Sequence, residues 1–134
     1  MRIFIDSNVL ISAIVFDANE LKVMVQCPRK GHLLVISEHI EEEVFRTMLD
    51  KFPEYSQLLH EFMNLSAIEI VPRERYLERI EDFDMVRDKH DMHVLASADY
   101  AGCDLIVTGD KDLLVLKSCN EIRIMNARDT MKVI

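Results

Sequence analysis

Two short stretches, one near each end of the chain, share one form: an apolar β-branched run, then an aspartate, then a helix-like pattern. The first runs from Arg2 to Leu10 with Asp6 at its centre, and the second runs from Leu105 to Leu114 with Asp110. A carboxylate at the carboxyl end of a buried parallel strand lies at the sheet edge where α/β proteins place their ligand sites. Two such carboxylates suggest that a cation binds between them.

The length and composition indicate one folded domain. With 134 residues, 49% of them apolar and 30% charged, the chain can bury a single core and is not of the disordered class. Its longest apolar run, from Val9 to Phe16, is too short to span a bilayer, and Arg2 leads directly into a strand pattern instead of a signal peptide. We therefore expect one domain over residues 1–134, no membrane contact and a cytoplasmic location.

The net charge of −8 argues against broad, nonspecific binding of duplex nucleic acid. A group of cations between Arg73 and Lys89 is interpreted as a solvated face that balances neighbouring acids such as Glu81. The three cysteines, which lack a C-x-x-C spacing, are expected to be inert thiols.

Strand and helix patterns alternate along the chain. The expected strands cover residues 2–5, 33–36, 68–71, 105–108 and 122–125. The first expected helix begins after Asp6, with Ser7 or Asn8 as its N-cap. Further helices are expected at residues 19–27, 37–49, 54–64, 76–80, 90–100, 111–116 and from 127 onward. The acidic stretch after residue 80 is expected to be a loop. This alternation predicts an α/β fold, a three-layer α/β/α sandwich with a mainly parallel central sheet.

Asp91 lies in the middle of an apolar helix stripe. With an increment of about 100° per residue, Val94, Leu95 and Ala98 fall within about 60° of it. A lone ionised carboxylate in a dry core is so costly that it becomes neutral or finds a partner. Asp91 could cap the helix, but Asp88 three residues earlier favours a metal site.

Two histidines on the same helix, His90 and His93, have a spacing that resembles a zinc pair. On the helical wheel, however, His93 lies about 160° away from Asp91. We interpret both as surface histidines and assign neither as a ligand.

Three consecutive glutamates, at positions 41–43, lie on the helix after Ser37. The wheel places Glu41 closest to the mean apolar direction, but periodicity does not select one, and such a run is more often a solvated face. One of them, with Asp6, Asp91 and Asp110, would supply four oxygen donors of the kind that suits Mg²⁺ or Mn²⁺. One or two such ions would neutralise the carboxylates and could activate water for phosphodiester hydrolysis.

Four segments, in order, carry a family resemblance. They are Ile5-Asp6-Ser7-Asn8-Val9-Leu10 with Ser12-Ala13, Ser37-x-x-Ile40-x-x-Glu43, Arg87-Asp88-x-x-Asp91 with Leu95-Ala96, and Thr108-Gly109-Asp110-x-Asp112-Leu113-Leu114. In these the chain resembles the PIN-domain family across nearly its whole length, and it is most similar to the small prokaryotic VapC-like toxins of toxin–antitoxin pairs. The chain departs from the family at Lys89 and His90, where related sequences often have a proline or a further acid.

The resemblance implies a metal-dependent ribonuclease that cleaves single-stranded RNA in an acidic cleft with Mg²⁺ or Mn²⁺. It selects Glu43 from the glutamate run. The catalytic and metal-binding carboxylates that it implies are Asp6, Glu43, Asp91 and Asp110. The auxiliary residues are the acids Asp88 and Asp112 and the polar residues Asn8 and Thr108, which would steady the cluster.

RNA would be held in part by cations on the rim of this cleft, with Arg87, Lys89 and Lys111 the nearest in sequence. The resemblance also implies an antitoxin protein bound over the cleft and a homodimer formed through helices near the amino terminus. Apolar helix residues that could support association are interpreted mainly as core: Val23, Met24, Phe45, Met48, Leu58, Leu59 and Met63.

Two alternatives remain open. A haloacid-dehalogenase-like phosphatase also has an aspartate after its first strand, but it normally needs a second acid two residues later, where this chain has Asn8. A PIN-like module that binds without catalysis would keep the same fold with purely structural acids.

Overall fold

The computed structural model describes residues 1–16 and 18–134, and within them six strands form one sheet in the order β3-β2-β1-β4-β6-β5. The strands are β1 (Arg2–Ile5), β2 (Leu33–Ser37), β3 (Glu69–Val71), β4 (Leu105–Val107), β5 (Ser118–Cys119) and β6 (Ile122–Met125). All neighbouring strands are parallel except β5, which runs antiparallel to β6 at the edge. Ile5 of β1 pairs with Val107 of β4, so Asp6 and Thr108 leave the sheet side by side.

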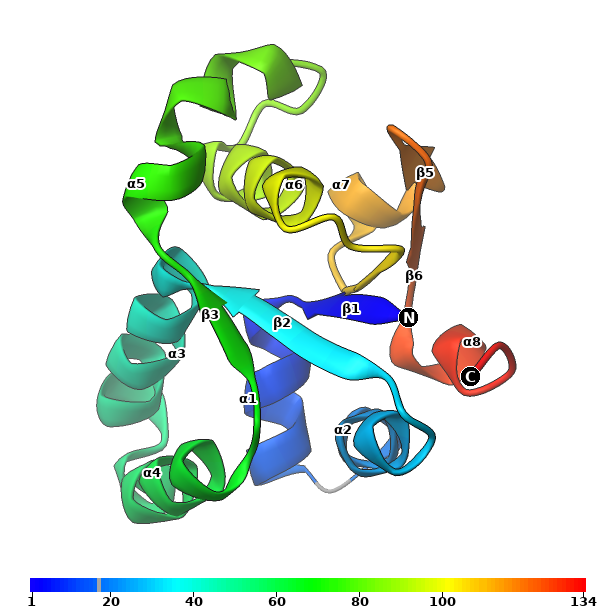
Figure 1. Cartoon of the computed structure of the whole chain (residues 1–134). Helices are drawn as coiled ribbons and strands as arrows, with labels where there is room; N and C mark the ends of the chain where they lie inside the picture. Colours follow the sequence, from blue (N-terminus) through cyan, green and yellow to red (C-terminus); the bar gives the residue numbers. More distant parts are fainter. Residues whose placement is uncertain (17) are drawn as a thin grey trace.

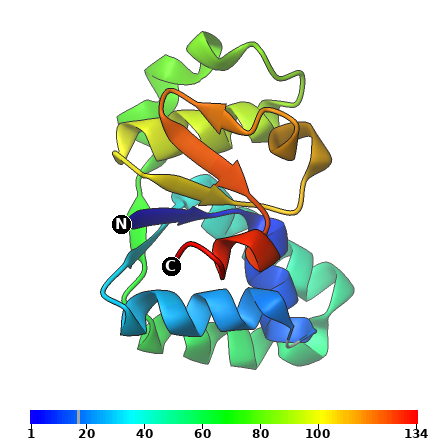
Figure 2. The same ribbon diagram turned by 90° about the vertical axis from the view of Figure 1, so that its right-hand side faces the viewer.

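Helices cover both faces of the sheet, which confirms the predicted three-layer sandwich (Figure 1). One face carries α1 (Ser7–Val15), α2 (Asn19–Arg29), α3 (Glu38–Lys51), the short 3₁₀ helix η1 (Pro53–Tyr55), α4 (Ser56–Leu65) and α8 (Ala127–Thr130). The other carries α5 (Arg73–Tyr76), the 3₁₀ helix η2 (Leu77–Phe83), α6 (Lys89–Tyr100) and α7 (Lys111–Leu114). Figure 2 shows α2 and α8 together on one side of the sheet and α6 on the other.

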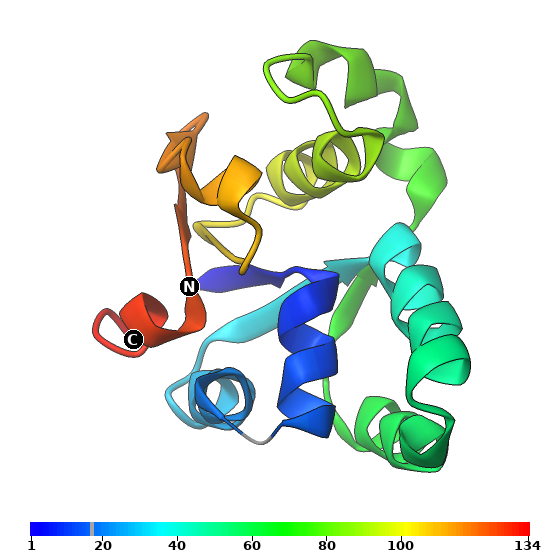
Figure 3. The same cartoon turned by 180° about the vertical axis from the view of Figure 1, so that it is seen from behind.

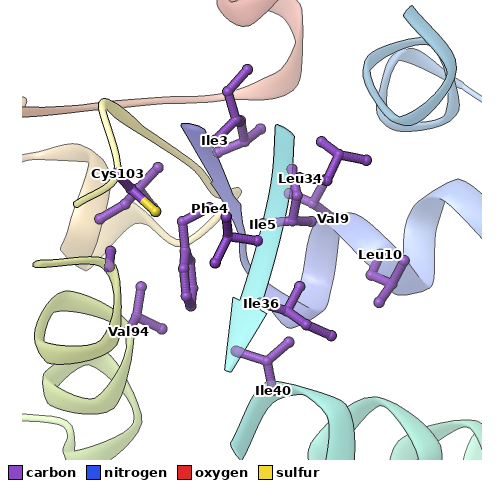
Figure 4. Close-up of a cluster of buried hydrophobic side chains, with 14 of the residues drawn as sticks. Ile3, Phe4, Ile5, Val9, Leu10, Leu34, Ile36, Ile40, Val94 and Cys103 are labelled. Carbon is purple, nitrogen blue, oxygen red and sulfur yellow. The ribbon is translucent and has the colours of Figure 1, made fainter. Parts of the chain in front are cut away.

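The central strands are apolar throughout because both of their faces are covered. Side chains alternate across a strand, so Phe4 lies on the opposite face from Ile3 and Ile5, and all three are fully buried. Figure 4 shows Phe4 pointing toward Val94 of α6, whereas Leu34 of β2 lies on the α1 side. This packing fixes α1 and α6 against the sheet and thereby positions the residues at their amino ends.

The amino ends of α1, α3, α6 and α7 are among those that meet the carboxyl edge of the sheet, and Figure 3 shows α1 leaving the end of β1. A side chain caps each of these helices: Asp6 caps α1, Ser37 caps α3, Asp88 caps α6 and Asp110 caps α7. The prediction that Ser7 or Asn8 caps the first helix is therefore wrong. The Asp6 carboxylate fulfils that role because it accepts the Ser7 backbone N–H at 2.8 Å.

Three local features differ from the expectations. Helix α2 continues past Pro28 to Arg29, because the Lys30 N–H still closes the last turn on the Gln26 carbonyl at 3.0 Å. The loop expected after residue 80 begins only at residue 84, since η2 extends to the buried Phe83. Strand β5, with only two residues, has no pattern long enough to recognise, and a tight turn at Asn120 with positive φ joins it to β6.

Cys27 and Cys103 are buried and Cys119 is partly exposed, and burial raises the pKa of each thiol. Among the described residues, none of the helices is long and apolar enough to cross a membrane.

Candidate active site

Asp6 is fully buried at the end of β1, and donors from four residues hold its carboxylate. Its Oδ1 accepts the Ser7 N–H at 2.8 Å and faces Nε2 of His90 at 3.0 Å. Its Oδ2 accepts the Thr108 hydroxyl at 2.7 Å and the Asn8 amide at 3.2 Å. Burial acts to raise the pKa of Asp6, but these partners, His90 foremost, hold it below its ordinary value. The Asp6 carboxylate is therefore ionised, its charge is balanced by His90, and its hydrogen bonds fix its orientation.

The loop after β4 is tied to Asp6 by the two polar residues that the family resemblance marks as steadying groups. Thr108 accepts the Asp110 N–H at 3.0 Å while donating its hydroxyl to Asp6. Asn8 accepts the Gly109 N–H at 2.8 Å, and a Cβ on that glycine would lie only 3.2 Å from the Asn8 oxygen. Asn8 is an amide and not the second acid that a dehalogenase-like phosphatase would need, and both its oxygen and its NH₂ group are engaged within the protein.

Glu43 lies next to Asp6 and shares its partners. One oxygen of Glu43 accepts the Ser7 hydroxyl at 3.1 Å, and the other lies 2.7 Å from Nδ1 of His90. Burial acts to raise the pKa of Glu43, but His90 and Ser7 hold it below its ordinary value. The other glutamates of the run are directed elsewhere, since Glu42 pairs with Arg73 at 2.6 Å and Glu41 lines a groove beside α4.

His90 bridges Asp6 and Glu43, and its side chain is only 21% exposed. Burial acts to lower the pKa of His90, but the hydrogen bonds and charges of the two carboxylates raise it to about 10. The ring is therefore an imidazolium at neutral pH and supplies the positive charge that the pair requires. We name Asp6, Glu43 and His90 the partnered group.

The prediction that His90 and His93 are surface residues is wrong. His93 is 8% exposed, stacks on the ring of His39 at 4.0 Å and lies 2.9 Å from the Tyr76 hydroxyl. The helical wheel allowed for one buried face, whereas α6 packs against the sheet on one side and against α5 and η2 on the other. His39 and His90 are the residues that sequence reasoning missed, and the departure from the family pattern at His90 was the available signal.

A second group of carboxylates centres on Asp91, which lacks such partners; the half-buried Asp110 accepts the Asp112 N–H at 2.9 Å, and Asp112 is exposed. Asp91 is 1% exposed, and neither of its oxygens has a hydrogen-bond partner among the described residues. Carboxylate oxygens of Asp91, Asp110 and Asp112 all lie within 4.8 Å of one another. Burial, followed by the negative charges of Asp110 and Asp88, raises the pKa of Asp91. We name Asp91, Asp110 and Asp112 the bare group.

The four carboxylates named by the resemblance thus fall into two adjoining groups. Asp6 and Glu43 share Ser7 and His90, whereas Asp91 and Asp110 belong to the bare group. The groups are linked through Thr108, which contacts Asp6 and Asp110, and through the adjacency of residues 90 and 91 on α6. Asp88 is exposed and caps α6 by accepting the His90 N–H at 2.9 Å.

The bare group fits a hard divalent cation. A buried, unpartnered carboxylate is costly, and two further carboxylates beside it increase that cost. Oxygen donors alone are the ligand type of Mg²⁺ and Mn²⁺. Asp91, Asp110 and Asp112 could therefore hold such an ion, and Asp6 could join them by exchanging its His90 contact for the metal.

The predicted rim cations lie around this edge with different surroundings. Arg87 is exposed and lines, together with Asp112, a pocket of about 270 Å³. Lys111 is exposed at the first position of α7, whereas Lys89 pairs with Glu81 at 3.1 Å. The interpretation of residues 73–89 as a charge-balanced face is confirmed only at Lys89. The other three ion pairs of this segment among the described residues reach acids outside it, such as Asp99.

The fold and the site together define the class of this protein. It is an α/β sandwich with carboxylates gathered at the carboxyl edge of a mainly parallel sheet. The sequence model of the PIN domain matches residues 2–112, and the chain belongs to this family.

Solved structures with the same fold include VapBC2 from Rickettsia felis, crystallised with a DNA fragment from its promoter. That match has a TM-score of 0.68 and 16% identity, and it covers 94% of this chain and 98% of the other. A second is VapC20 from Mycobacterium tuberculosis, described as a Sarcin-Ricin loop cleaving toxin. It has a TM-score of 0.64 and 14% identity, and it covers 90% of this chain and 98% of the other. A comparison with curated protein sequences finds no match.

Proposed function

We propose that this chain is a Mg²⁺- or Mn²⁺-dependent endoribonuclease that hydrolyses phosphodiester bonds of single-stranded RNA, as the toxin of a toxin–antitoxin pair. The observation that supports this most directly is Asp91, a buried carboxylate without a partner that lies beside Asp110 and Asp112. The choice of RNA is supported by family membership and by the shared fold with VapC20, a Sarcin-Ricin loop cleaving toxin.

In this proposal Asp91, Asp110 and Asp112 hold the ion, with Asp6 as a further ligand. When bound, a divalent ion would supply a water of lowered pKa and would stabilise charge on the phosphate oxygens. Asp6 already accepts hydrogen bonds from four residues, at least as many as a carboxylate has lone pairs, so ligation requires that His90 withdraw from its Oδ1.

Glu43 has a different role in the proposal, because it is half-buried and ionised but remains open to solvent on one side. Its side chain is 28% exposed, and hydrogen bonds from Ser7 and His90 fix its orientation. A carboxylate held in this way can accept a hydrogen bond from the attacking water and orient it toward phosphorus. Glu43 thus positions the nucleophile or helps to hold a second ion.

RNA contacts are assigned to the rim because the net charge of the whole chain is −8. Arg87 and Asp112 share one pocket, which brings a guanidinium to the border of the bare group. Lys111 begins α7 directly after Asp110. Arg87 and Lys111 would contact phosphates, and Lys89 would do so to a smaller extent because of its ion pair with Glu81. Such contacts do not distinguish one RNA sequence from another.

An antitoxin partner and a homodimer are further parts of the proposal. The fold shared with VapBC2 supports the partner, and exposed apolar side chains on α3 and α4 support association. Leu49 is 66% exposed, Leu58 47% and Leu65 88%. In contrast, Val23, Met24, Met48 and Leu59 are core residues, and Phe45 and Met63 are partly buried against that core.

The experiment is incubation of the chain with a mixed RNA pool and Mn²⁺ or EDTA, followed by mapping of the new RNA ends. The proposal predicts cleavage with Mn²⁺, none with EDTA, and none with the Asp6→Ala or Asp91→Asn variants. The second variant keeps the shape of the side chain and leaves the α1 cap intact. Cleavage that persists in EDTA would contradict metal dependence, and hydrolysis of a small aryl phosphate without RNA cleavage would favour the phosphatase alternative.

A further inference from the structure

We propose that His39, Glu43 and His90 form a second metal site, one that takes a borderline transition metal such as Zn²⁺. Two imidazole nitrogens and one carboxylate oxygen face one another here: Nε2 of His39, Nδ1 of His90 and Oε2 of Glu43. This donor set differs from the all-oxygen bare group, and the metal preference differs with it.

The spacing of the three donor atoms fits a tetrahedral metal. Their separations are 2.7 Å for His90 to Glu43, 3.2 Å for His39 to His90, and 3.8 Å for His39 to Glu43. In a tetrahedral zinc site with bonds of about 2.0–2.1 Å, neighbouring ligand atoms lie about 3.3 Å apart. The observed triangle brackets this value, so shifts of about half an ångström in the side chains would complete three corners of the tetrahedron.

The surroundings hold these ligands in place, as outer contacts do in metalloproteins. His90 directs its other ring nitrogen, Nε2, at the buried Asp6 carboxylate 3.0 Å away, a carboxylate–histidine arrangement that orients a ligand and raises its basicity. The ring of His39 is stacked on His93 at 4.0 Å. His39 and Glu43 are four residues apart on α3 and therefore share one helix face.

The site is also accessible. The side chains of His39, Glu43 and His90 are 22%, 28% and 21% exposed, which leaves an entry path and a fourth position for water or another ligand. Entry of the metal displaces the proton from Nδ1 of His90 into solvent, and the metal then provides the charge that neutralises Glu43. Binding is a property of these side chains and does not require the chain to cleave RNA.

The test is titration of the metal-free chain with Co²⁺, followed by visible absorption. Cobalt on the oxygen-only carboxylates is octahedral and absorbs weakly, whereas four-coordinate cobalt with nitrogen ligands absorbs far more strongly. We expect one strongly absorbing site, competed by Zn²⁺. The His39→Gln variant should bind Co²⁺ more than about 100-fold more weakly, because loss of even an outer-sphere partner costs about 10- to 100-fold.

Two variants serve as controls. His60→Gln removes an exposed histidine on α4 and should leave the cobalt spectrum unchanged. Asp91→Asn disables the bare group and should also leave the spectrum unchanged, which separates this site from the proposed nuclease centre. X-ray absorption of the zinc-loaded wild-type chain, expected to show two imidazoles in the coordination shell, gives a result that does not depend on how any variant folds. A weak octahedral spectrum, or full binding by His39→Gln, would overturn the proposal.

Discussion

The partnered group and the bare group lie at the same sheet edge, yet the protein neutralises only one of them. Asp6 and Glu43 share the His90 imidazolium, and the pKa of each carboxyl is held below its ordinary value. Asp91 is just as buried as Asp6 but has no hydrogen-bond partner among the described residues, and its pKa is raised. The chain therefore carries its own counter-charge for the first group, and under the proposed function the second group would take a cation from solution.

The contrast also suggests how the two groups cooperate. The partnered group is assembled without metal, and through Thr108 it fixes the loop that carries Asp110. The buried, unpartnered Asp91 makes the bare group destabilising, and under the proposed function a bound ion would remove that cost.

The largest effect is expected from loss of charge in the bare group. Asp110→Asn should reduce Mn²⁺-dependent RNA cleavage by at least about 100-fold, the scale on which loss of one electrostatic group in an active site acts. The fold should persist, because an asparagine can still cap α7. The measurement is the single-turnover cleavage rate, with the exposed Asp129→Asn as the matched control. Full activity in Asp110→Asn would remove this residue from the mechanism.

A large effect on stability is expected from the partnered group. His90→Gln leaves Asp6 and Glu43 without a counter-charge and should lower the free energy of unfolding by about 2–4 kcal/mol at pH 7. The pKa of His90 is raised from 6.5 to about 10 in the folded chain, so its stabilisation is complete below pH 6.5 and is lost as pH rises through about 10. Urea unfolding at several pH values should show the gap between wild type and variant narrowing above pH 10. His60→Gln is the control, and a gap independent of pH would contradict the assigned charge.

In the bare group, a substitution that removes charge should change the free energy of unfolding in the opposite direction. Without metal, Asp91→Asn should raise the free energy of unfolding at neutral pH by about 1–3 kcal/mol, because one pKa unit corresponds to about 1.4 kcal/mol. The pKa of Asp91 is raised in the folded chain, so ionisation destabilises the wild type above that pKa, and the gain should disappear below about pH 3.8. Thermal unfolding in EDTA provides the measurement. A variant less stable than wild type would indicate that Asp91 has a partner.

The smallest effect is expected at the rim. Arg87→Gln should weaken RNA binding by a few-fold and reduce the slope of log affinity against log salt by about 0.7, the value for one phosphate contact on a single strand. The test is a salt series of binding measurements in Ca²⁺, with Lys132→Gln as a control on the opposite part of the chain. An unchanged slope would place the RNA elsewhere.

Much of the site follows from local sequence rules. Asp6 and Asp110 are recognisable because each follows a buried strand, and Asp91 because it interrupts an apolar stripe. Glu43 could not be selected by periodicity, since Glu41 lies closer to the apolar direction of α3; the family resemblance selected it, and the structure directs it at Ser7 and His90.

The division into two groups could not be predicted, because it depends on the orientation of one imidazole ring. His90 on α6 contacts Asp6, which lies 84 positions earlier in the chain, and Glu43, which lies 47 positions earlier. A helical wheel describes one helix and cannot predict contacts between distant segments. The same limit explains His93, whose burial results from α5 and η2 covering the second side of α6. Hydrophobic periodicity describes one interface at a time.

Direct measurement of Mn²⁺ binding to the metal-free chain tests the central claim that the bare group takes its counter-charge from solution. In calorimetric titration at pH 7, the wild type should bind Mn²⁺ and gain about 2.7 kcal/mol of stability at a hundredfold excess over Kd. Asp91→Asn should lose this site and this gain, whereas Asp129→Asn should keep both. Equal binding and equal stabilisation in wild type and Asp91→Asn would contradict the claim.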